Sequence, residues 1–212
     1  MKAIMESEQL EQSLTDTLRK SDLSSVATDA GELVIDSLLD EGVVKDIPAV
    51  GAIVSLWKTG ANIRDHYFIK KLVLFLSELQ KVDVSERNEM INRLEDDPKY
   101  GQKAGESLVL LLERLDDMQK PTLLGKAFKA YCKNEIDSVQ LQSLYRVIDR
   151  SFIPHLTYLP EFINDPQAAG TPGEVLGTFV DSGLAWVPPN YATTTIMPTN
   201  IARLFNSILL EK

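Results

Sequence analysis

The sequence is poor in the residues that most often carry chemistry. Its 212 residues include one cysteine, Cys132, and two histidines, His66 and His155. A single cysteine excludes an intrachain disulfide and an all-cysteine zinc site, and the two histidines stand too far apart for a recognisable metal motif. Lys133 would favour a reactive thiol at Cys132, but a half-buried structural thiol is the simpler interpretation. We therefore predict no metal and no cofactor.

Catalytic motifs are missing as well. Ser151 and His155 stand four residues apart with a proline before the histidine, which is poor geometry for a nucleophile and its base. Adjacent acids, such as Asp116 and Asp117, diverge from each other, whereas a glycosidase needs two carboxylates facing one cleft. Gly125 precedes a lysine but lacks the upstream glycine and the hydroxyl residue of a phosphate-binding loop. We predict no catalytic residue and a protein that is not an enzyme.

Basic residues are outnumbered. The chain has 22 Lys and Arg against 31 Asp and Glu, a net charge of −9. This balance works against nucleic-acid binding, where neutralising phosphates supplies most of the affinity. The charge also falls in blocks: residues 1–46 and 82–119 are acidic, and residues 47–81 and 120–150 are basic. Blocks of opposite sign are expected to attract each other as neighbouring helices.

Long apolar runs are absent. The longest, from Ile47 to Trp57, is shorter than the about 20 residues that cross a bilayer. A buried core helix with small residues at a close crossing is the simpler interpretation. The alternative is a membrane-perturbing hairpin formed with residues 68–79. Its markers would be Val50, Gly51, Val54, Trp57, Lys58, Lys70 and Lys71. The N-terminus has no secretory signal, so we expect a cytoplasmic protein.

A helical pattern fills most of the chain. The spacing of apolar residues, with the most apolar helix at its centre, predicts a multi-helix bundle. Asp83 with Glu86, and Asp137 with Gln140, have the spacing of capping boxes. The predicted helices are residues 6–20, 25–41, 49–62, 65–81, 86–95, 102–118, 121–132 and 138–150.

The texture changes near Pro160. Three prolines and two glycines predict a loop over residues 160–173. A helix at 174–182, a hairpin with strands at 184–187 and 191–197, and a final helix capped by Thr199 follow. This order is that of a degenerate winged-helix unit. The expected class is therefore mainly α, with a helical bundle at 1–155 and a small winged-helix-like α+β unit at 160–212.

Three polar residues are expected inside the helical part. Arg64 and Asp65 stand between two apolar helices, and Arg114 lies within the most apolar helix. A buried arginine needs a carboxylate or carbonyl partner, so we predict that these residues form a polar core that specifies the fold. Asp65, Asp116 and Asp117 are the candidate partners.

Two stretches carry a family likeness. Residues 46–76 read Asp-Ile-Pro-Ala-Val-Gly at the start and Lys70-Lys71 near the end, and residues 111–131 contain Leu-Leu-Glu-Arg-Leu-Asp-Asp-Met and Leu-Gly-Lys-Ala-Phe-Lys-Ala-Tyr. With these motifs, residues 35–150 resemble a group of uncharacterised bacterial helical proteins. The C-terminal third is similar to a winged-helix element. The resemblance implies an association with mobile elements and phage defence, and it implies no active site.

These observations favour a non-enzymatic interaction or regulatory protein. Trp186, Pro189 and Tyr191 are the expected contact residues, because aromatic side chains beside prolines are typical of binding surfaces. The partner would be another protein or a second copy of the chain. The wing region, residues 186–199, has no basic residue, so we expect it to bind protein and not DNA.

Overall fold

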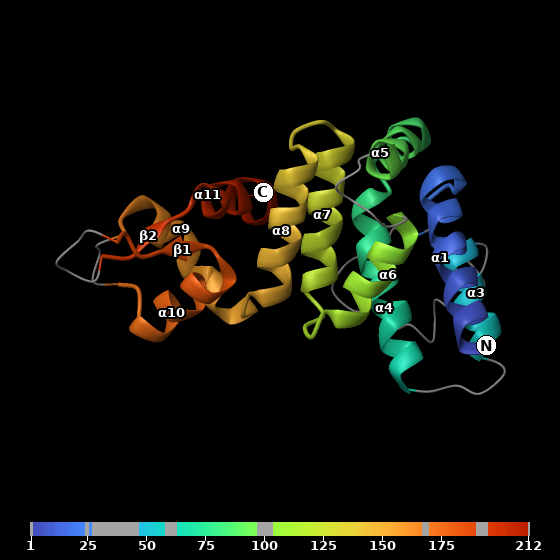
Figure 1. Ribbon diagram of the computed structural model, residues 1–212, viewed down its shortest axis with the longest axis horizontal. Helices are drawn as coiled ribbons and strands as arrows, with labels where there is room; N and C mark the ends of the chain where they lie inside the picture. The colour runs from blue at the N-terminus through green and yellow to red at the C-terminus, as the bar shows by residue number, and fades with distance from the viewer. Residues whose placement is uncertain are drawn as a thin grey trace. The chain divides into compact units, whose positions relative to one another are not determined.

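The computed structural model describes residues 2–23, 26, 47–57, 63–96, 104–166, 170–189 and 195–211. The described part is mainly helical, with one small antiparallel sheet near the C-terminus (Figure 1). The expected fold class is confirmed. The helix expected over 25–41 lies outside the described residues, apart from its second residue.

Contacts divide the chain into two units, Met1–Glu135 and Ile136–Lys212. The sequence placed this division later, in residues 155–160, because the helical pattern continues without a break to residue 150. The helix over 138–150, however, packs against the C-terminal elements of the second unit.

The first unit consists of helices. Its helix α1 contacts α3, α5 and α6, while α4 and α7 lie side by side (Figure 1). Phe75 of α4 and Phe128 of α7 meet edge to face, with ring centroids 5.3 Å apart, which anchors that pair in the core. The bounds are α1 Lys2–Lys20, α3 Pro48–Trp57, α4 Ile63–Leu79, α5 Val84–Asp96, α6 Ala104–Arg114 and α7 Lys120–Cys132.

Glycines allow two of these helices to approach their neighbours closely. A Cβ at Gly105 of α6 would lie 2.3 Å from the carbonyl oxygen of Glu11 in α1. A Cβ at Gly125 of α7 would lie 2.7 Å from the carbonyl oxygen of Phe75 in α4. Real Cβ contacts are not this short, so both crossings require glycine.

Helices of like charge and helices of opposite charge both pack together: the expected pairing of opposite blocks occurs between α5 and α7 and between α4 and α6. The neighbours α1, α5 and α6 are each net acidic, and the neighbours α4 and α7 are each net basic. Apolar faces decide which helices meet, and compensation takes place between individual side chains at the contacts. The α1–α5 contact, described below, is an example.

The second unit begins with α8 (Ser138–Arg150), whose predicted and observed bounds coincide. Asp137 accepts a hydrogen bond from the Gln140 amide at 2.8 Å, and the Gln140 side chain accepts one from the Asp137 amide at 2.9 Å. This confirms the second predicted capping box. For the first, the Glu86 carboxylate accepts from the Asp83 amide at 3.1 Å.

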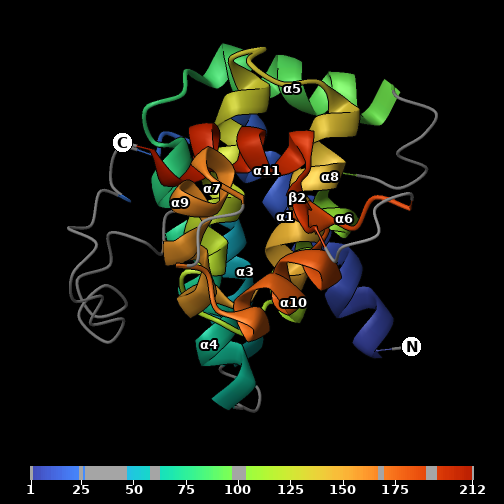
Figure 2. The ribbon, with the colours of Figure 1, turned by 90° about the vertical axis from the view of Figure 1, so that its left-hand side faces the viewer.

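The remaining elements of this unit are short. They are a 3-10 helix η2 (Ile153–Tyr158), α9 (Leu159–Asn164), α10 (Gly173–Ser182), β1 (Ala185–Trp186), β2 (Met197–Pro198), α11 (Asn200–Phe205) and a π-helical turn η3 (Asn206–Leu210). Figure 2 shows α9, α10, β2 and α11 of this unit facing the viewer. Ala185 pairs with Pro198, and Trp186 pairs with Met197.

Three sequence predictions differ from these bounds. The loop expected from residue 160 begins instead with α9, because Pro160 occupies the first turn of a helix, where its missing N–H is not needed. The helix expected to reach residue 118 ends at Arg114, and the Asp117 carboxylate then accepts from the Gln119 amide at 2.7 Å in a local turn. The first hairpin strand is shorter than expected, since β1 ends at Trp186, two residues before Pro188, and residues 191–194 of the second expected strand lie outside the described residues.

Candidate interaction surface

Gly183 turns the chain from α10 into β1. Its φ of 87° is a left-handed conformation, which glycine adopts without steric cost at the end of a helix. Thr199 fastens this turn to the start of α11: its hydroxyl donates to the Gly183 carbonyl at 2.9 Å and accepts from the Ala202 amide at 3.1 Å. The Thr199 cap predicted from the sequence is thereby confirmed. The sheet is thus held at both of its helical ends.

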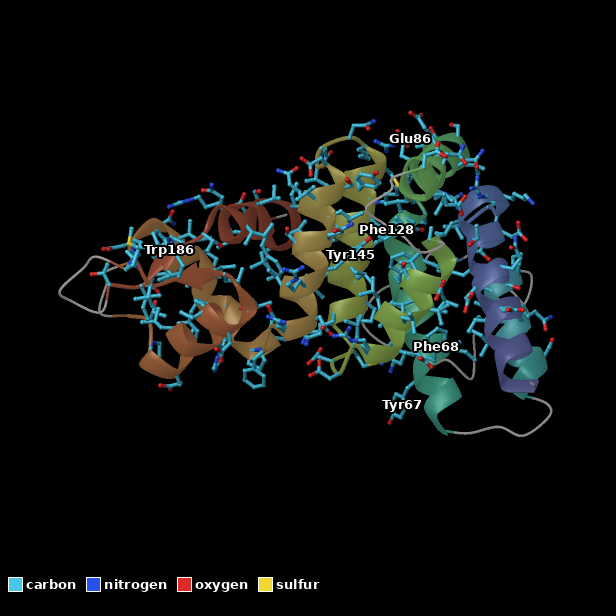
Figure 3. All side chains as sticks on the ribbon, viewed as in Figure 1. Tyr67, Phe68, Glu86, Phe128, Tyr145 and Trp186 are labelled. Carbon is cyan, nitrogen blue, oxygen red and sulfur yellow. The ribbon has the colours of Figure 1, made fainter. Side chains whose placement is uncertain are left out.

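The residues after this turn expose apolar surface. Ala185 is buried, whereas Trp186 is 47% exposed and Val187 is 48% exposed. Pro189 is also exposed. We call Trp186, Val187 and Pro189 the hairpin face; Figure 3 shows Trp186 beside the two strands. Two consecutive large apolar side chains in water are unusual enough to indicate a contact surface.

Helix α10 presents a second exposed face and contacts β1. Glu174, Gly177, Val180 and Asp181 are exposed and recur at the spacing of one side of a helix. We call these four residues the α10 face. The opposite side is core: Phe179 is buried and its ring lies 5.4 Å from that of Phe162.

Charge near these faces is of one sign. No Lys or Arg occurs between Arg150 and Arg203. The acids of this stretch, Glu161, Asp165, Glu174 and Asp181, are all exposed. The exposed apolar side chains of α10 and β1 therefore lie in an environment with no neighbouring cation in sequence, and its local potential is negative.

Ser151 and His155 do not form a dyad. The Ser151 hydroxyl donates to the Val147 carbonyl at 2.7 Å. His155 Nδ1 lies 2.9 Å from the Thr178 hydroxyl, which itself donates to the Val175 carbonyl at 2.8 Å. The Thr178 hydroxyl has one proton and two neighbouring acceptors, so the tautomer of His155 sets which of the two groups donates between Nδ1 and Thr178. The histidine thus links η2 to α10.

Among the arginine side chains of the first unit that the structure describes, Arg87 is buried and Arg114 is not. Arg114 is exposed, since it ends α6 on the side away from Leu108 and Leu112. Its expected place in a buried polar core is wrong. The side chains of Arg64 and Asp65 lie outside the described residues. Of the candidate partners, Asp116 accepts instead from the buried Lys120 at 2.6 Å, and this hydrogen bond lowers the pKa of Asp116.

Arg87 is 2% exposed, and its guanidinium donates to four backbone carbonyl oxygens. Its Nη1 donates to Leu18 at 3.1 Å and to Thr17 at 3.4 Å, and its Nη2 donates to Ser21 at 2.7 Å. Its Nε donates to Val82 at 3.2 Å. Three of these four carbonyls are at the end of α1, which carries a partial negative charge, and the Thr17 carbonyl also accepts from the Ser21 amide at 3.1 Å. Burial lowers the pKa of Arg87, but an arginine stays protonated.

A second arginine, Arg19 of α1, binds side chains of α5. Its guanidinium donates to Asn88 at 2.7 Å and Asn92 at 2.6 Å, and it pairs with Glu95 at 2.7 Å. Each of these two acidic helices thus contributes an arginine that binds the other helix: Arg87 of α5 is buried, and Arg19 of α1 lies at the edge of the contact. Sequence reasoning missed Arg87 because α5 is polar overall. The available signal was its spacing of three, four and seven residues from Met90, Ile91 and Leu94, which are all buried.

The third helix of this junction is α3. The Thr17 hydroxyl, fully buried, donates to the Ser13 carbonyl at 2.8 Å and accepts from the Ala49 amide at 3.0 Å. Thr17 thereby satisfies a free amide in the first turn of α3. The junction of α1, α3 and α5 is closed by polar contacts and serves the fold.

Residues proposed to meet a membrane lie in helices that pack in the first unit. Val50 is fully buried, while Gly51, Val54, Lys70 and Lys71 are half-buried. Lys71 donates to the Glu113 carbonyl at 3.2 Å, and burial lowers its pKa. Lys58 and the Trp57 side chain lie outside the described residues. In the part of the chain that is described, every helix is too short or too polar to span a bilayer.

Cys132 is buried in the first unit. Burial raises the pKa of its thiol to about 12, and the Lys133 beside it does not offset this effect. The thiol is thus neutral and structural, and more deeply buried than expected. Over the described ranges, no three His, Cys, Asp or Glu side chains converge as metal ligands would.

Comparisons with known proteins give no relative. No family model, curated protein or solved structure matches this chain. The contact residues expected from the sequence are placed as follows: Trp186 and Pro189 are exposed on the hairpin face, and Tyr191 lies outside the described residues.

Proposed function

We propose that this chain is a non-enzymatic protein-interaction module and that the hairpin face of its second unit is the contact surface. The observation that carries the proposal is the exposure of Trp186, in a sheet fastened by Thr199, and of Val187, which directly follows the strand. Tryptophan at the centre of an interface contributes more binding energy than most residues. No charge occurs between Asp181 and Arg203, so little desolvation of charge opposes burial of this face.

The test compares the full chain with a Trp186→Ala/Val187→Ala variant. Both are immobilised for partner capture and, separately, sedimented across a range of concentrations. A captured partner or a self-associated species that the double variant loses supports the proposal. Val139→Ala is the matched control, since Val139 is 53% exposed on α8 and belongs to neither face. Equal capture and equal sedimentation by all three proteins would contradict it.

The alternative function, membrane perturbation by residues 47–79, stays a hypothesis. To reach lipid, Val50 and Ile53 of α3 would have to leave a core in which they are buried. Flotation of the chain with anionic liposomes tests this alternative: lipid binding that a Val54→Asp variant loses would support it.

A further inference from the structure

We infer that the α10 face and the adjoining hairpin face dock a cationic amphipathic helix of a protein partner. This inference rests on the proposed function and names the chemistry of the partner. Three observations carry it: the apolar side chains that α10 and β1 leave exposed, the acids that flank them, and an open glycine in the middle of α10.

The first observation is a path of apolar surface from α10 to the sheet. Val180 is 36% exposed on α10, and Trp186 is 47% exposed on β1, two elements that contact each other. Only the turn at Gly183 and the buried Leu184 and Ala185 separate α10 from Trp186 in sequence. An apolar stripe of this kind is what the apolar side of an amphipathic helix covers.

The second observation is negative charge at the edge of this path. Glu174 lies one turn from Gly177, Asp181 lies next to Val180, and both carboxylates are exposed. Because no Lys or Arg occurs from residue 151 to residue 202, a partner that carries cations would complement these carboxylates. A second copy docking face to face would instead oppose like charges, and an anionic membrane or nucleic acid would be repelled.

The third observation is Gly177 itself. It lies inside α10, it is exposed, and a Cβ built on it would meet nothing within 4 Å. Neither packing nor a left-handed φ in this chain requires glycine there, although glycine weakens an exposed helix relative to alanine. A glycine on the outer side of a helix lets the backbone of a second helix approach closely, as small residues do wherever helices cross tightly. The same device is used inside the first unit at Gly105 and Gly125.

The probe is a fluorescein-labelled synthetic helix with leucine and alanine on one side and lysine on the other. Its comparison peptide has glutamate in place of every lysine. Fluorescence anisotropy with the full chain should show binding of the lysine peptide alone, weakening as salt is added. Glu174→Gln/Asp181→Asn should weaken binding ~fivefold, the effect of two exposed ion pairs. The charge-matched control is Glu8→Gln/Glu89→Gln, two exposed acids of the first unit, which should bind the peptide as the wild type does.

Gly177→Ala separates docking from stability. Alanine fits the open space and favours the helix, so the urea midpoint of this variant should rise while its affinity for the lysine peptide falls. If Gly177→Ala bound the lysine peptide as tightly as the wild type does, the inference that the partner helix approaches α10 closely at Gly177 would be overturned. Equal weakening by the control pair would show general attraction to an acidic protein and would overturn the inference as well.

The two proposals fail in different ways. If the lysine and glutamate peptides bind alike, while Trp186→Ala/Val187→Ala still loses a captured partner or self-association, the cationic helix is wrong and the interaction module stands. If that double variant loses neither its captured partners nor the lysine peptide, both proposals are wrong.

Discussion

Removing the Arg87 side chain would take the guanidinium donor from the carbonyls of Leu18 and Ser21 at the end of α1, whereas the Thr17 carbonyl keeps the Ser21 amide as a donor. Each buried acceptor left unsatisfied costs about 1–3 kcal/mol, so we expect Arg87→Met to lower the free energy of unfolding by about 3 kcal/mol or more. Urea denaturation followed by circular dichroism measures the change. Arg146→Met, at an exposed arginine, should stay within about 0.5 kcal/mol of the wild type. A loss in Arg87→Met no larger than this would show that the carbonyls find other donors.

A second prediction at this scale concerns Cys132. Because burial raises the pKa of its thiol to about 12, the folded protein should not react with Ellman's reagent at pH 8, and it should react at once in urea. The thiolate is favoured in the unfolded chain, whose thiol ionises near the reference value of 9.0. The thiol's contribution to stability is therefore complete below pH 9 and is lost as the pH rises from 9 toward 12.

The control for this pH dependence is Cys132→Ala, which has no thiol to ionise. Its free energy of unfolding should fall less steeply than that of the wild type between pH 9 and pH 12. Parallel curves for the two proteins, or rapid labelling of the folded wild type at pH 8, would show that the thiol is not shielded as described.

At the scale of elements, two glycines in helices should respond to alanine in opposite ways. In Gly125→Ala the added Cβ would lie 2.7 Å from the Phe75 carbonyl and 2.8 Å from the Glu78 Cβ, so α4 and α7 must separate. We expect a loss of about 1–3 kcal/mol in the free energy of unfolding. Gly177→Ala, in open space, should gain up to about 1 kcal/mol. Chemical denaturation of both variants measures this contrast, and a gain in Gly125→Ala would contradict the close crossing.

Local signals predicted some elements well and others poorly. The bounds of α8 follow from the capping box at Asp137, because the contacts that start this helix are three residues apart and visible in the sequence. The short helix α9 could not be predicted from the sequence, because Pro160 is equally compatible with a loop and with the first turn of a helix. The two strands pair in the predicted order, but Thr195 and Ile196 lie outside β2 although β-branched residues favour a strand.

The same limit applies to functional residues. The exposure of Trp186 agrees with its proline-rich, uncharged neighbourhood. The burial of Arg87 depends on carbonyl groups of α1 that are far away in the sequence, and no local pattern reports such a partner. The role of Gly177 depends on the empty space around it, which the sequence does not show. A glycine at a close helix crossing and a glycine on an open helix surface cannot be told apart from sequence alone.

At the scale of the whole molecule, the two contact units should lose structure separately. Arg87 acts inside the first unit, so we expect Arg87→Met to speed hydrogen exchange in α1 and α5 and leave α8 and α11 unchanged. Exchange followed by mass spectrometry of peptides, at increasing urea, distinguishes the units. Equal acceleration in all four helices would mean that the chain unfolds as a single cooperative body.

The contact between Arg87 of α5 and the end of α1 joins two segments that are synthesised at different times. The Arg87 donors follow the carbonyls of Thr17, Leu18 and Ser21 by 70, 69 and 66 positions in the chain. At a synthesis rate of about 5–20 residues per second, α1 is complete roughly 3 to 14 seconds before Arg87 exists. During biosynthesis α3 is made before α5 and can cover its side of α1 first, so the carbonyls at the end of α1 wait for their buried donor longer than the helix waits for apolar contacts.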